Sequence, residues 1–289
     1  MIREKLRGTG VALVTPFTRE LAVDYDALRK LLDFVLEGGV NYLVINGTTA
    51  ESVTTTSEEK AEILRFVKQQ AGHRVPLVYG LGGNNTQHLL DTIATTDLEG
   101  IAALLSVSPY YNKPSQQGIY QHYVALANAS PVPLILYNVP GRTGSNITAE
   151  TTLKLSAHEN IIGIKEASGN LEQCMYIAKH KPKSFMLISG DDMLAVPLAV
   201  FGADGVISVL ANAFPEKFAT MVQLALDGDL KAAGSLALNF ADVNPLLYEE
   251  SNPVGLKAVL ERFGICTAAV RLPLVEASAG LKDRLYKLL

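Results

Sequence analysis

The sequence contains no tryptophan and only two cysteines, Cys174 and Cys266, among its 289 residues. Two cysteines cannot build a disulfide framework, and neither has a second cysteine or a histidine at the spacing of zinc ligands. The five histidines are scattered, and the HExxH and GxSxG motifs do not occur. These absences indicate a reduced protein without a metal site, and they exclude the two most common hydrolase signatures.

The sequence also has little excess charge of either sign and few long apolar runs. The formal net charge is −4 and the basic residues are dispersed, so the sequence lacks the basic face of a nucleic-acid binder. The first ten residues, MIREKLRGTG, have no apolar segment of the kind found in secretory signals, and no apolar run reaches membrane-spanning length. We therefore expect a cytoplasmic protein that binds neither nucleic acid nor membrane.

What the sequence does contain is a repeated alternation of apolar runs and amphipathic segments. The runs, rich in β-branched residues, lie at 11–17, 42–49, 75–83, 101–111, 132–140, 161–168, 185–192 and 203–212. Near-continuous apolar strands alternating with helices predict a parallel sheet covered on both sides. No glycine-rich dinucleotide loop follows the first run, which disfavours an open doubly wound sheet. The predicted fold is an α/β protein, a (β/α)₈ TIM barrel.

Two of the intervening segments carry clear helix signals. In residues 25–39, four apolar side chains fall on one helical face and a Gly-Gly pair closes the segment. Residues 56–59, Thr-Ser-Glu-Glu, form a capping box at the start of another helix.

The β pattern stops at about residue 225. Three later segments, 227–250, 252–264 and 278–289, have helical patterns. We expect a catalytic barrel of residues 1–224 and a C-terminal helical region, 225–289, that packs on the barrel or on a neighbouring subunit.

Functional residues of such barrels lie at the carboxyl ends of the strands. The side chains there are mostly hydroxyls and phenols with one amine: Thr48, Thr49, Ser108, Tyr110, Tyr111, Tyr137, Lys165 and Ser208. Carboxylates are few and imidazoles absent, which is poor for metal binding or two-carboxylate hydrolysis. The set suits amine chemistry assisted by hydroxyl proton shuttles.

Lys165 interrupts the apolar run NIIGIKEAS, residues 160–168. Strand alternation places Ile161, Gly163 and Lys165 on one face, with Gly163 leaving room beneath the lysine, and Glu166 on the other face. Burial favours the neutral amine, which can attack a carbonyl and form a Schiff base. A structural lysine, paired to a carboxylate or reaching out to solvent, remains the alternative from position alone.

Three further features allow both a functional and a purely structural interpretation. GTTAES, residues 47–52, could bind a small carboxylate through backbone donors or could simply cap a helix. Tyr111 and Tyr137 could be core aromatics. Arg142 could be a solvated loop residue or could hold a carboxylate through two hydrogen bonds.

Six motifs, in order, resemble the dihydrodipicolinate synthase family of pyruvate-dependent class I aldolases, which also include N-acetylneuraminate lyase. They are GTTAES, SPYYNKPSQQG, YNVPGRTG, IIGIKEASGN, SGDD and GADGVISV. The resemblance spans nearly the whole chain and extends to ESNPVGLKAVLERFG near the C-terminus. It implies a lyase that needs no metal or organic cofactor, because the imine serves as the electron sink.

The resemblance assigns catalytic roles to four residues. Lys165 corresponds to the Schiff-base lysine for pyruvate and Tyr137 to the phenol that moves protons there. Thr48 and Tyr111 correspond to the rest of the hydroxyl relay, with Tyr111 reaching into a neighbouring subunit's site. The chain is therefore expected to form at least a dimer, and the family commonly builds a homotetramer from two tight dimers.

Substrate contacts follow from the same resemblance. Thr49, with Thr48, matches the grip on the pyruvate carboxylate, and the backbones of Gly190 and Ile207 match the wall of the pyruvate pocket. Arg142 matches the residue that holds the carboxylate of L-aspartate 4-semialdehyde, whereas relatives acting on sugar acids generally lack an arginine there.

The implied reaction condenses pyruvate with aspartate semialdehyde to 4-hydroxy-tetrahydrodipicolinate, the entry step of lysine and diaminopimelate biosynthesis. Two alternatives remain at this stage. One is another pyruvate-dependent aldolase, such as a sialate or keto-deoxy sugar-acid lyase. The other is an inactive barrel that binds a small ligand as a regulator.

The sequence departs from the family pattern at two places. Ala50 stands where GTTGES has glycine, which could alter the local turn. At the regulatory site for lysine, beside Tyr110, Ser52 and Asn84 match the family. His88 replaces the usual acidic residue there, and Lys60 stands where histidine is common. We therefore expect weak or absent feedback inhibition by lysine.

Overall fold

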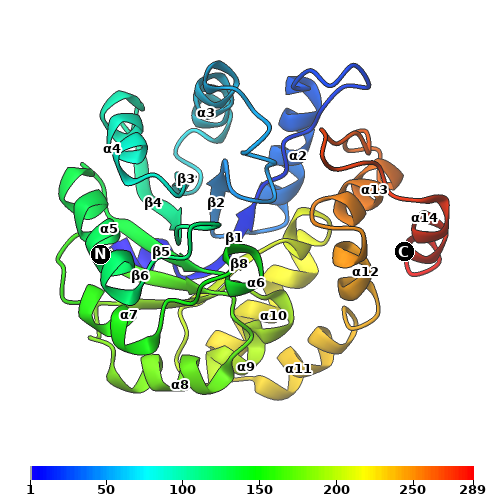
Figure 1. Ribbon diagram of the computed structural model, residues 1–289. Helices are drawn as coiled ribbons and strands as arrows, with labels where there is room; N and C mark the ends of the chain where they lie inside the picture. Colours follow the sequence, from blue (N-terminus) through cyan, green and yellow to red (C-terminus); the bar gives the residue numbers. More distant parts are fainter. Residues whose placement is uncertain (1) are drawn as a thin grey trace.

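The computed structural model describes residues 2–289, and in it eight parallel strands close into a barrel in sequence order, β1 pairing with both β2 and β8. The strands are β1 Gly8–Ala12, β2 Tyr42–Ile45, β3 Leu77–Gly80, β4 Ile101–Val107, β5 Leu134–Asn138, β6 Ile161–Glu166, β7 Met186–Ser189 and β8 Gly205–Ser208. Figure 1 looks into the barrel, with the helices arranged around it. The predicted (β/α)₈ fold is confirmed.

The α-helices surround this barrel and continue beyond it. They are α1 Ile2–Lys5, α2 Tyr25–Glu37, α3 Ser57–Ala71, α4 Thr86–Thr95, α5 Gln116–Ala129, α6 Pro140–Thr143, α7 Ala149–Leu155, α8 Leu171–His180, α9 Ala195–Val200, α10 Pro215–Leu226, α11 Leu230–Leu238, α12 Val243–Glu249, α13 Val254–Arg262 and α14 Ala279–Tyr286. The capping box predicted at Thr56 and Glu59 is present at the start of α3.

The strands are shorter than the apolar runs, which continue into the loops. The first run, 11–17, was placed wrongly: β1 begins at Gly8, and residues 13–17 lie beyond its end. Gly10 explains why the strand is hard to recognise. A Cβ at this position would lie 2.2 Å from the Tyr42 ring, so the close approach of that ring to β1 requires a glycine.

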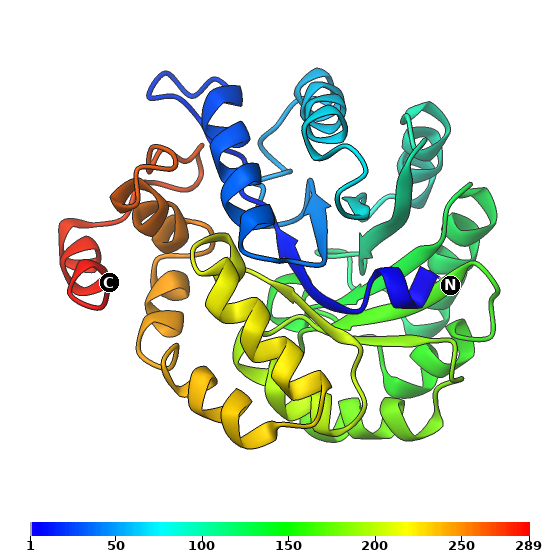
Figure 2. The same ribbon diagram turned by 180° about the vertical axis from the view of Figure 1, so that it is seen from behind.

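The apolar core has two layers, one inside the barrel and one between the strands and the helices. Ile135, Met186 and Ile188 belong to the inner layer. Leu6, just after α1, packs into the same layer and closes the end of the barrel from which the strands start. Figure 2 shows α1 lying across that end. The opposite end of the barrel is left for the site.

Strand β6 does not follow simple alternation. Its pairing with β5 shifts between Leu134 and Ile135, so that Ile161 pairs with Leu134 but Gly163 pairs with Ile135. Ile161 consequently packs in the outer layer, and the prediction that it shares a face with Lys165 was wrong.

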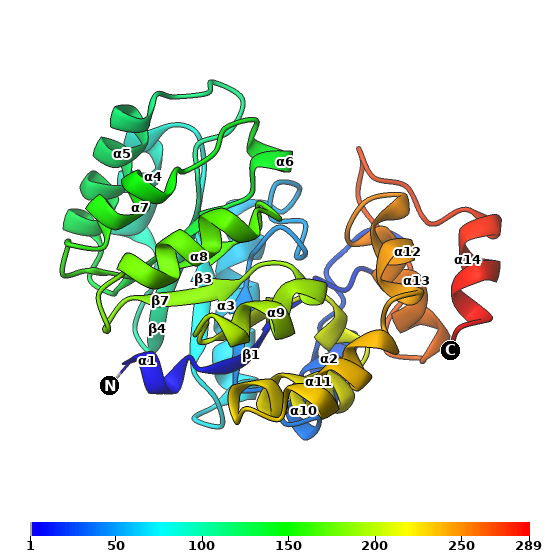
Figure 3. The ribbon, with the colours of Figure 1, turned by 90° about the horizontal axis from the view of Figure 1, so that it is seen from below.

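Helices α12, α13 and α14 pack together on one side of the molecule, away from α4, α5 and α7, as Figure 3 shows. Loop segments at residues 250–253 and 263–278 flank α13. No helix within residues 2–289 combines the length and the apolar character needed to cross a membrane.

Candidate active site

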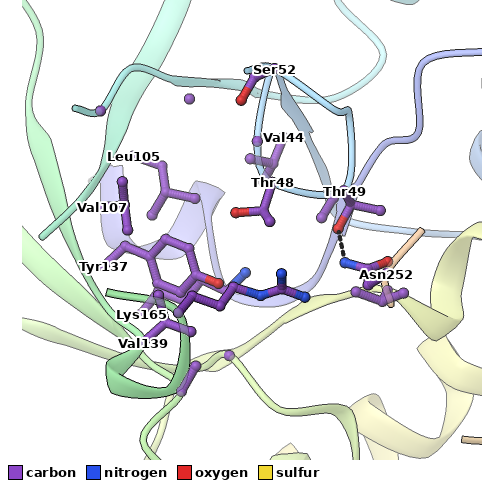
Figure 4. Close-up of a pocket in the computed structure, with 18 of the residues that line it drawn as sticks. Val44, Thr48, Thr49, Ser52, Leu105, Val107, Tyr137, Val139, Lys165 and Asn252 are labelled. Carbon is purple, nitrogen blue, oxygen red and sulfur yellow. Dashed lines mark hydrogen bonds between the residues drawn. The ribbon is translucent and has the colours of Figure 1, made fainter. Parts of the chain in front are cut away.

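A cavity of about 660 Å³ opens at the carboxyl ends of the strands. Most of the predicted site residues line it: Thr48, Thr49, Tyr137, Arg142, Lys165 and Gly190. Figure 4 shows Thr48 facing Tyr137 and Lys165 across the cavity. Residues from β5, β6 and the loops after β2 and β7 therefore meet at one place, as the fold requires.

Lys165 comes from β6 and is buried, with only 6% of its surface exposed. Its Nζ lies 4.4 Å from the centre of the Tyr137 ring, and the two residues are direct neighbours across β5 and β6. Within residues 2–289, no carboxylate forms an ion pair with this amine. The structure therefore does not support the alternative of a lysine paired to a carboxylate.

The room for the Lys165 side chain comes from Gly190, not from Gly163. A Cβ at Gly190 would lie 3.1 Å from Lys165 Cε and 2.6 Å from the Cβ of Ala167. At Gly163, a Cβ would instead meet Met186, 2.7 Å away. Gly163 thus serves the packing of β6 against β7, and Gly190 serves the lysine.

Glu166, the next residue, points away from the cavity, and its carboxylate is surrounded by hydrogen-bond donors. Its carboxylate accepts hydrogen bonds from Asn138 Nδ2 at 3.0 and 3.1 Å, from Gln173 Nε2 at 2.8 Å and from the backbone N–H of Ser168 at 2.8 Å. Asn138 follows Tyr137, and Glu166 follows Lys165. The hydrogen bonds between Asn138 and Glu166 therefore fix the two strand ends that carry the phenol and the amine.

Thr48 and Thr49 lie in a turn after β2 and do not cap α3, because Thr56 is the N-cap of that helix. The Thr49 hydroxyl accepts a 3.0 Å hydrogen bond from Asn252 Nδ2, shown in Figure 4. Ala50 is buried and is not among the residues with positive φ. The alanine in GTTAES is therefore accommodated without left-handed backbone at that position.

Arg142 lies on the short helix α6 at the exposed rim of the cavity. Its guanidinium forms no ion pair with a carboxylate of residues 2–289. The side chain is therefore free to bind an anionic group that enters the cavity.

Two predicted residues lie outside the cavity wall. Ile207 is buried in the inner layer of the barrel, while Val209, just beyond the end of β8, contributes to the lining instead. Tyr111 is 88% exposed and does not line the cavity of its own chain, although the preceding residue, Tyr110, does.

Among the lining residues that were missed, three come from the C-terminal region: Asn244 and Tyr248 from α12, and Asn252 just beyond it. Only Asn244 and Tyr248 share a face of α12, because Ser251, just before Asn252, has a left-handed backbone with φ at 83°, so no periodic signal in the sequence joined the three residues. Burial, together with nearby Asp192, raises the pKa of Tyr248. Burial also raises the pKa of Asp192 to about 6, although it accepts hydrogen bonds from two backbone N–H groups.

The described residues, 2–289, contain no group of three or more His, Cys, Asp or Glu side chains arranged to hold a metal ion. The chemistry available in the cavity includes that of one buried amine, three phenols, three threonine hydroxyls and a guanidinium. Such a set can form an imine and move protons around it.

Comparison with known proteins gives consistent matches along the chain. Residues 5–289 match the Dihydrodipicolinate synthetase family. The 4-hydroxy-tetrahydrodipicolinate synthase of Cytophaga hutchinsonii is 53% identical over 274 residues, covering 95% of this chain and 92% of that protein.

Solved structures agree with these matches. The chloride-inhibited dihydrodipicolinate synthase of Acinetobacter baumannii, complexed with pyruvate, superimposes with a TM-score of 0.95 at 36% identity, covering 98% of this chain and 97% of that one. A lysine-bound dihydrodipicolinate synthase from Cyanidioschyzon merolae gives a TM-score of 0.94 at 37% identity, with coverage of 98% and 97%. The similarity therefore includes both the barrel and the C-terminal helices.

Proposed function

The chain belongs to the dihydrodipicolinate synthetase family, and on that premise we propose that the cavity at the mouth of the barrel is its active site. The protein is a lyase of the class I aldolase type. It condenses pyruvate with L-aspartate 4-semialdehyde to 4-hydroxy-tetrahydrodipicolinate, the entry step of lysine and diaminopimelate biosynthesis. The sugar-acid lyase alternative is not favoured.

The observation that carries the assignment of the site is the buried amine of Lys165 beside the Tyr137 ring, without a carboxylate partner in residues 2–289. The amine attacks the keto carbon of pyruvate and water leaves, giving an imine. Loss of a methyl proton gives the enamine, whose carbon attacks the aldehyde carbon of the second substrate, and the aldehyde oxygen takes up a proton. The substrate's own amine then attacks the imine carbon and displaces Lys165 as the ring closes.

The hydroxyls around Lys165 carry the protons of these steps. Tyr137 is the nearest phenol, and Thr48 faces it across the cavity. Thr48 and Thr49 hold the pyruvate carboxylate, and the backbone of Gly190 borders the lysine side chain.

Arg142 binds the carboxylate of aspartate semialdehyde at the rim of the cavity. Its unpaired guanidinium supports this role, because a planar guanidinium can donate two parallel hydrogen bonds to a carboxylate. Tyr248 and Asn244 form the wall that faces the second substrate, and α12 thereby makes the C-terminal region part of the site.

Tyr111 completes the relay only from a neighbouring subunit. It is 88% exposed, its backbone is left-handed with φ at 73°, and it does not line the cavity of its own chain. We propose at least a dimer, and a tetramer of two tight dimers, built from catalytic barrels of residues 1–224 with helical regions 225–289. A cytoplasmic location fits the two free cysteines.

Product formation from pyruvate and aspartate semialdehyde, without added metal, tests the function. We expect a measurable initial rate and, for Arg142→Gln, a KM for aspartate semialdehyde raised about tenfold with the KM for pyruvate unchanged. No rate from folded protein, together with cleavage of a sialic or keto-deoxy sugar acid, would contradict the synthase assignment.

The proposed regulatory site for lysine lies beside Tyr110. Ser52 lines the cavity nearby, and Asn84 Nδ2 donates a hydrogen bond to the Tyr110 carbonyl at 3.0 Å. His88 is exposed on the first turn of α4, and burial lowers the pKa of Lys60 on α3. Neither side chain offers a carboxylate to the ammonium of a lysine molecule, which supports weak or absent feedback.

A further inference from the structure

A second buried lysine, Lys257 on α13, is paired with Glu51 in the turn after β2. Both side chains are almost completely buried, and Nζ lies 2.6 Å from Oε1. Nζ also donates to the carbonyl of Ala269 at 2.8 Å, and Oε2 accepts from the backbone N–H of Arg271 at 2.9 Å. Burial lowers the pKa of Lys257, while Glu51 opposes that shift.

Stability alone is a weak explanation for such a pair. Two charges taken out of water lose hydration that their attraction only partly replaces, and apolar side chains of the same volume often serve as well. Lys257 Nζ also lies 4.2 Å from the centre of the Phe17 ring. An apolar side chain at position 257 would therefore also have an apolar neighbour to pack against. The pair is therefore better explained by what it holds in place.

Glu51 belongs to the turn that presents Thr48 and Thr49 to the cavity. Its φ of 54° is left-handed, an unfavourable conformation for a residue with a long side chain. The backbone N–H of Glu51 donates to the carbonyl of Thr48 at 3.0 Å. Holding the Glu51 carboxylate therefore maintains the turn that sets the direction of the Thr48 and Thr49 donors.

The other contacts to this turn come from the same part of the chain. Asn252 donates to the Thr49 hydroxyl at 3.0 Å, and Arg271 Nη1 donates to the carbonyl of Thr54 at 2.9 Å. The segment that contains α13 thus contacts the turn at its substrate end, its middle and its far end.

We propose that the Glu51–Lys257 pair is a positioning device that sets the affinity of the site for pyruvate by fixing the Thr48–Thr49 turn. The inference rests on the proposed function, because it assumes that this turn binds the pyruvate carboxylate. Neither residue lines the cavity, so both act through the turn.

The test is the double variant Glu51→Gln/Lys257→Met, which removes both charges and keeps unbranched side chains of similar length. We expect this variant to fold. The pyruvate concentration needed for half-maximal borohydride trapping on Lys165 should be about tenfold higher or more. The KM for aspartate semialdehyde should change less than about twofold, because Arg142 lies on α6, outside this turn.

A matched control is Glu261→Gln/Lys282→Met, which removes a 3.2 Å ion pair between α13 and α14 that does not touch the turn. It should leave pyruvate trapping unchanged. If the first double variant does not fold, Glu51→Gln alone is expected to weaken trapping in the same direction.

Pyruvate half-saturation equal to that of the unmodified protein, in folded Glu51→Gln/Lys257→Met, would overturn the proposal and leave the pair a purely structural feature. The trapping assay needs no aspartate semialdehyde. An unmodified protein that traps pyruvate but does not consume the semialdehyde would contradict the proposed function and still allow this test.

Discussion

Lys165 at the mouth of the barrel and Lys257 at the junction of α13 with the turn after β2 have similar surroundings in most respects. Both are buried, at 6% and 0% exposure, and each amine lies near the centre of an aromatic ring, at 4.4 Å from Tyr137 and 4.2 Å from Phe17. Lys257 has Glu51 at 2.6 Å, whereas Lys165 forms no ion pair within residues 2–289.

This difference underlies the two roles that we propose for these lysines. A buried ammonium with a carboxylate and a carbonyl acceptor has its charge and its donors satisfied, so it remains a structural cation. The amine of Lys165 has no counter-ion within residues 2–289 and lines the cavity, where an amine can attack a carbonyl as a nucleophile. The carboxylate next to Lys165 in sequence, Glu166, faces the other side of the strand and is occupied by amide donors.

The largest effect is expected from making the same substitution at both lysines. Lys165→Met should lower kcat by more than roughly 10³-fold and abolish borohydride trapping, because no imine can form. Lys257→Met should instead lower the free energy of unfolding by about 3–5 kcal/mol, because it leaves Glu51 buried without its partner. Rates, trapping and urea unfolding of both variants, at a temperature where both are folded, provide the measurement.

A trapped adduct in Lys165→Met would show that another amine carries the chemistry. An unchanged unfolding free energy for Lys257→Met would mean that water reaches Glu51, and the contrast between the two lysines would then lose its basis.

His122 on α5 tests what burial alone does to a basic group. The ring is buried, and its Nδ1 shares a 2.8 Å hydrogen bond with Thr86 Oγ1. Burial lowers the pKa of the ring to about 4. The unfolded chain therefore binds more protons between about pH 6.5 and 4, and stability falls as the pH falls through this range. Over that interval the loss from this one group is about 3 kcal/mol.

Replacing the ring by an amide, in His122→Gln, should remove that contribution to the pH dependence of the unfolding free energy, measured in urea at about pH 7 and pH 4. The control is His73→Gln, at an exposed position. Equal acid sensitivity of the two variants would contradict the role of His122.

Giving Lys165 a carboxylate should make it resemble Lys257. Ile188 on β7 is the cross-strand neighbour of Lys165 and is fully buried in the inner layer. Ile188→Asp should slow imine formation about 10- to 100-fold at neutral pH, because the carboxylate stabilises the ammonium, with recovery at higher pH. Ile188→Asn has the same shape without the charge. If both variants show the same rates and the same pH profile, the absence of a counter-ion is not what makes Lys165 reactive.

Local patterns in the sequence predicted much of the fold because they depend on neighbouring residues. The helix over 25–37 follows from its apolar spacing, and the α3 capping box follows from four consecutive residues. β1 was misplaced because Gly8 and Gly10 resemble a loop, and only the distant Tyr42 ring explains Gly10. The shifted register that moves Ile161 outward likewise depends on pairing with another strand.

The site was predictable where a strand end carried an unusual residue, as at Lys165, and much less so where the fold joins distant segments. Glu51 and Lys257 are 206 positions apart, and Thr49 and Asn252 are 203 apart. No periodicity connects such residues, so the contribution of α12 and α13 to the cavity and its turn emerged only from the structure.

The same comparison applies to free lysine as an effector, for which we expect the smallest effect. The ammonium of a bound lysine molecule needs a carboxylate, as Lys257 needs Glu51, and the proposed regulatory site offers His88 and Lys60 instead. Lysine should therefore change the initial rate by less than about twofold at concentrations near those in cells. His88→Glu supplies the missing charge and should introduce inhibition that His88→Gln does not. Strong inhibition of the unmodified protein would mean that uncharged acceptors suffice to bind the ammonium. The need for a carboxylate partner, inferred from the two buried lysines, would then not extend to this exposed site.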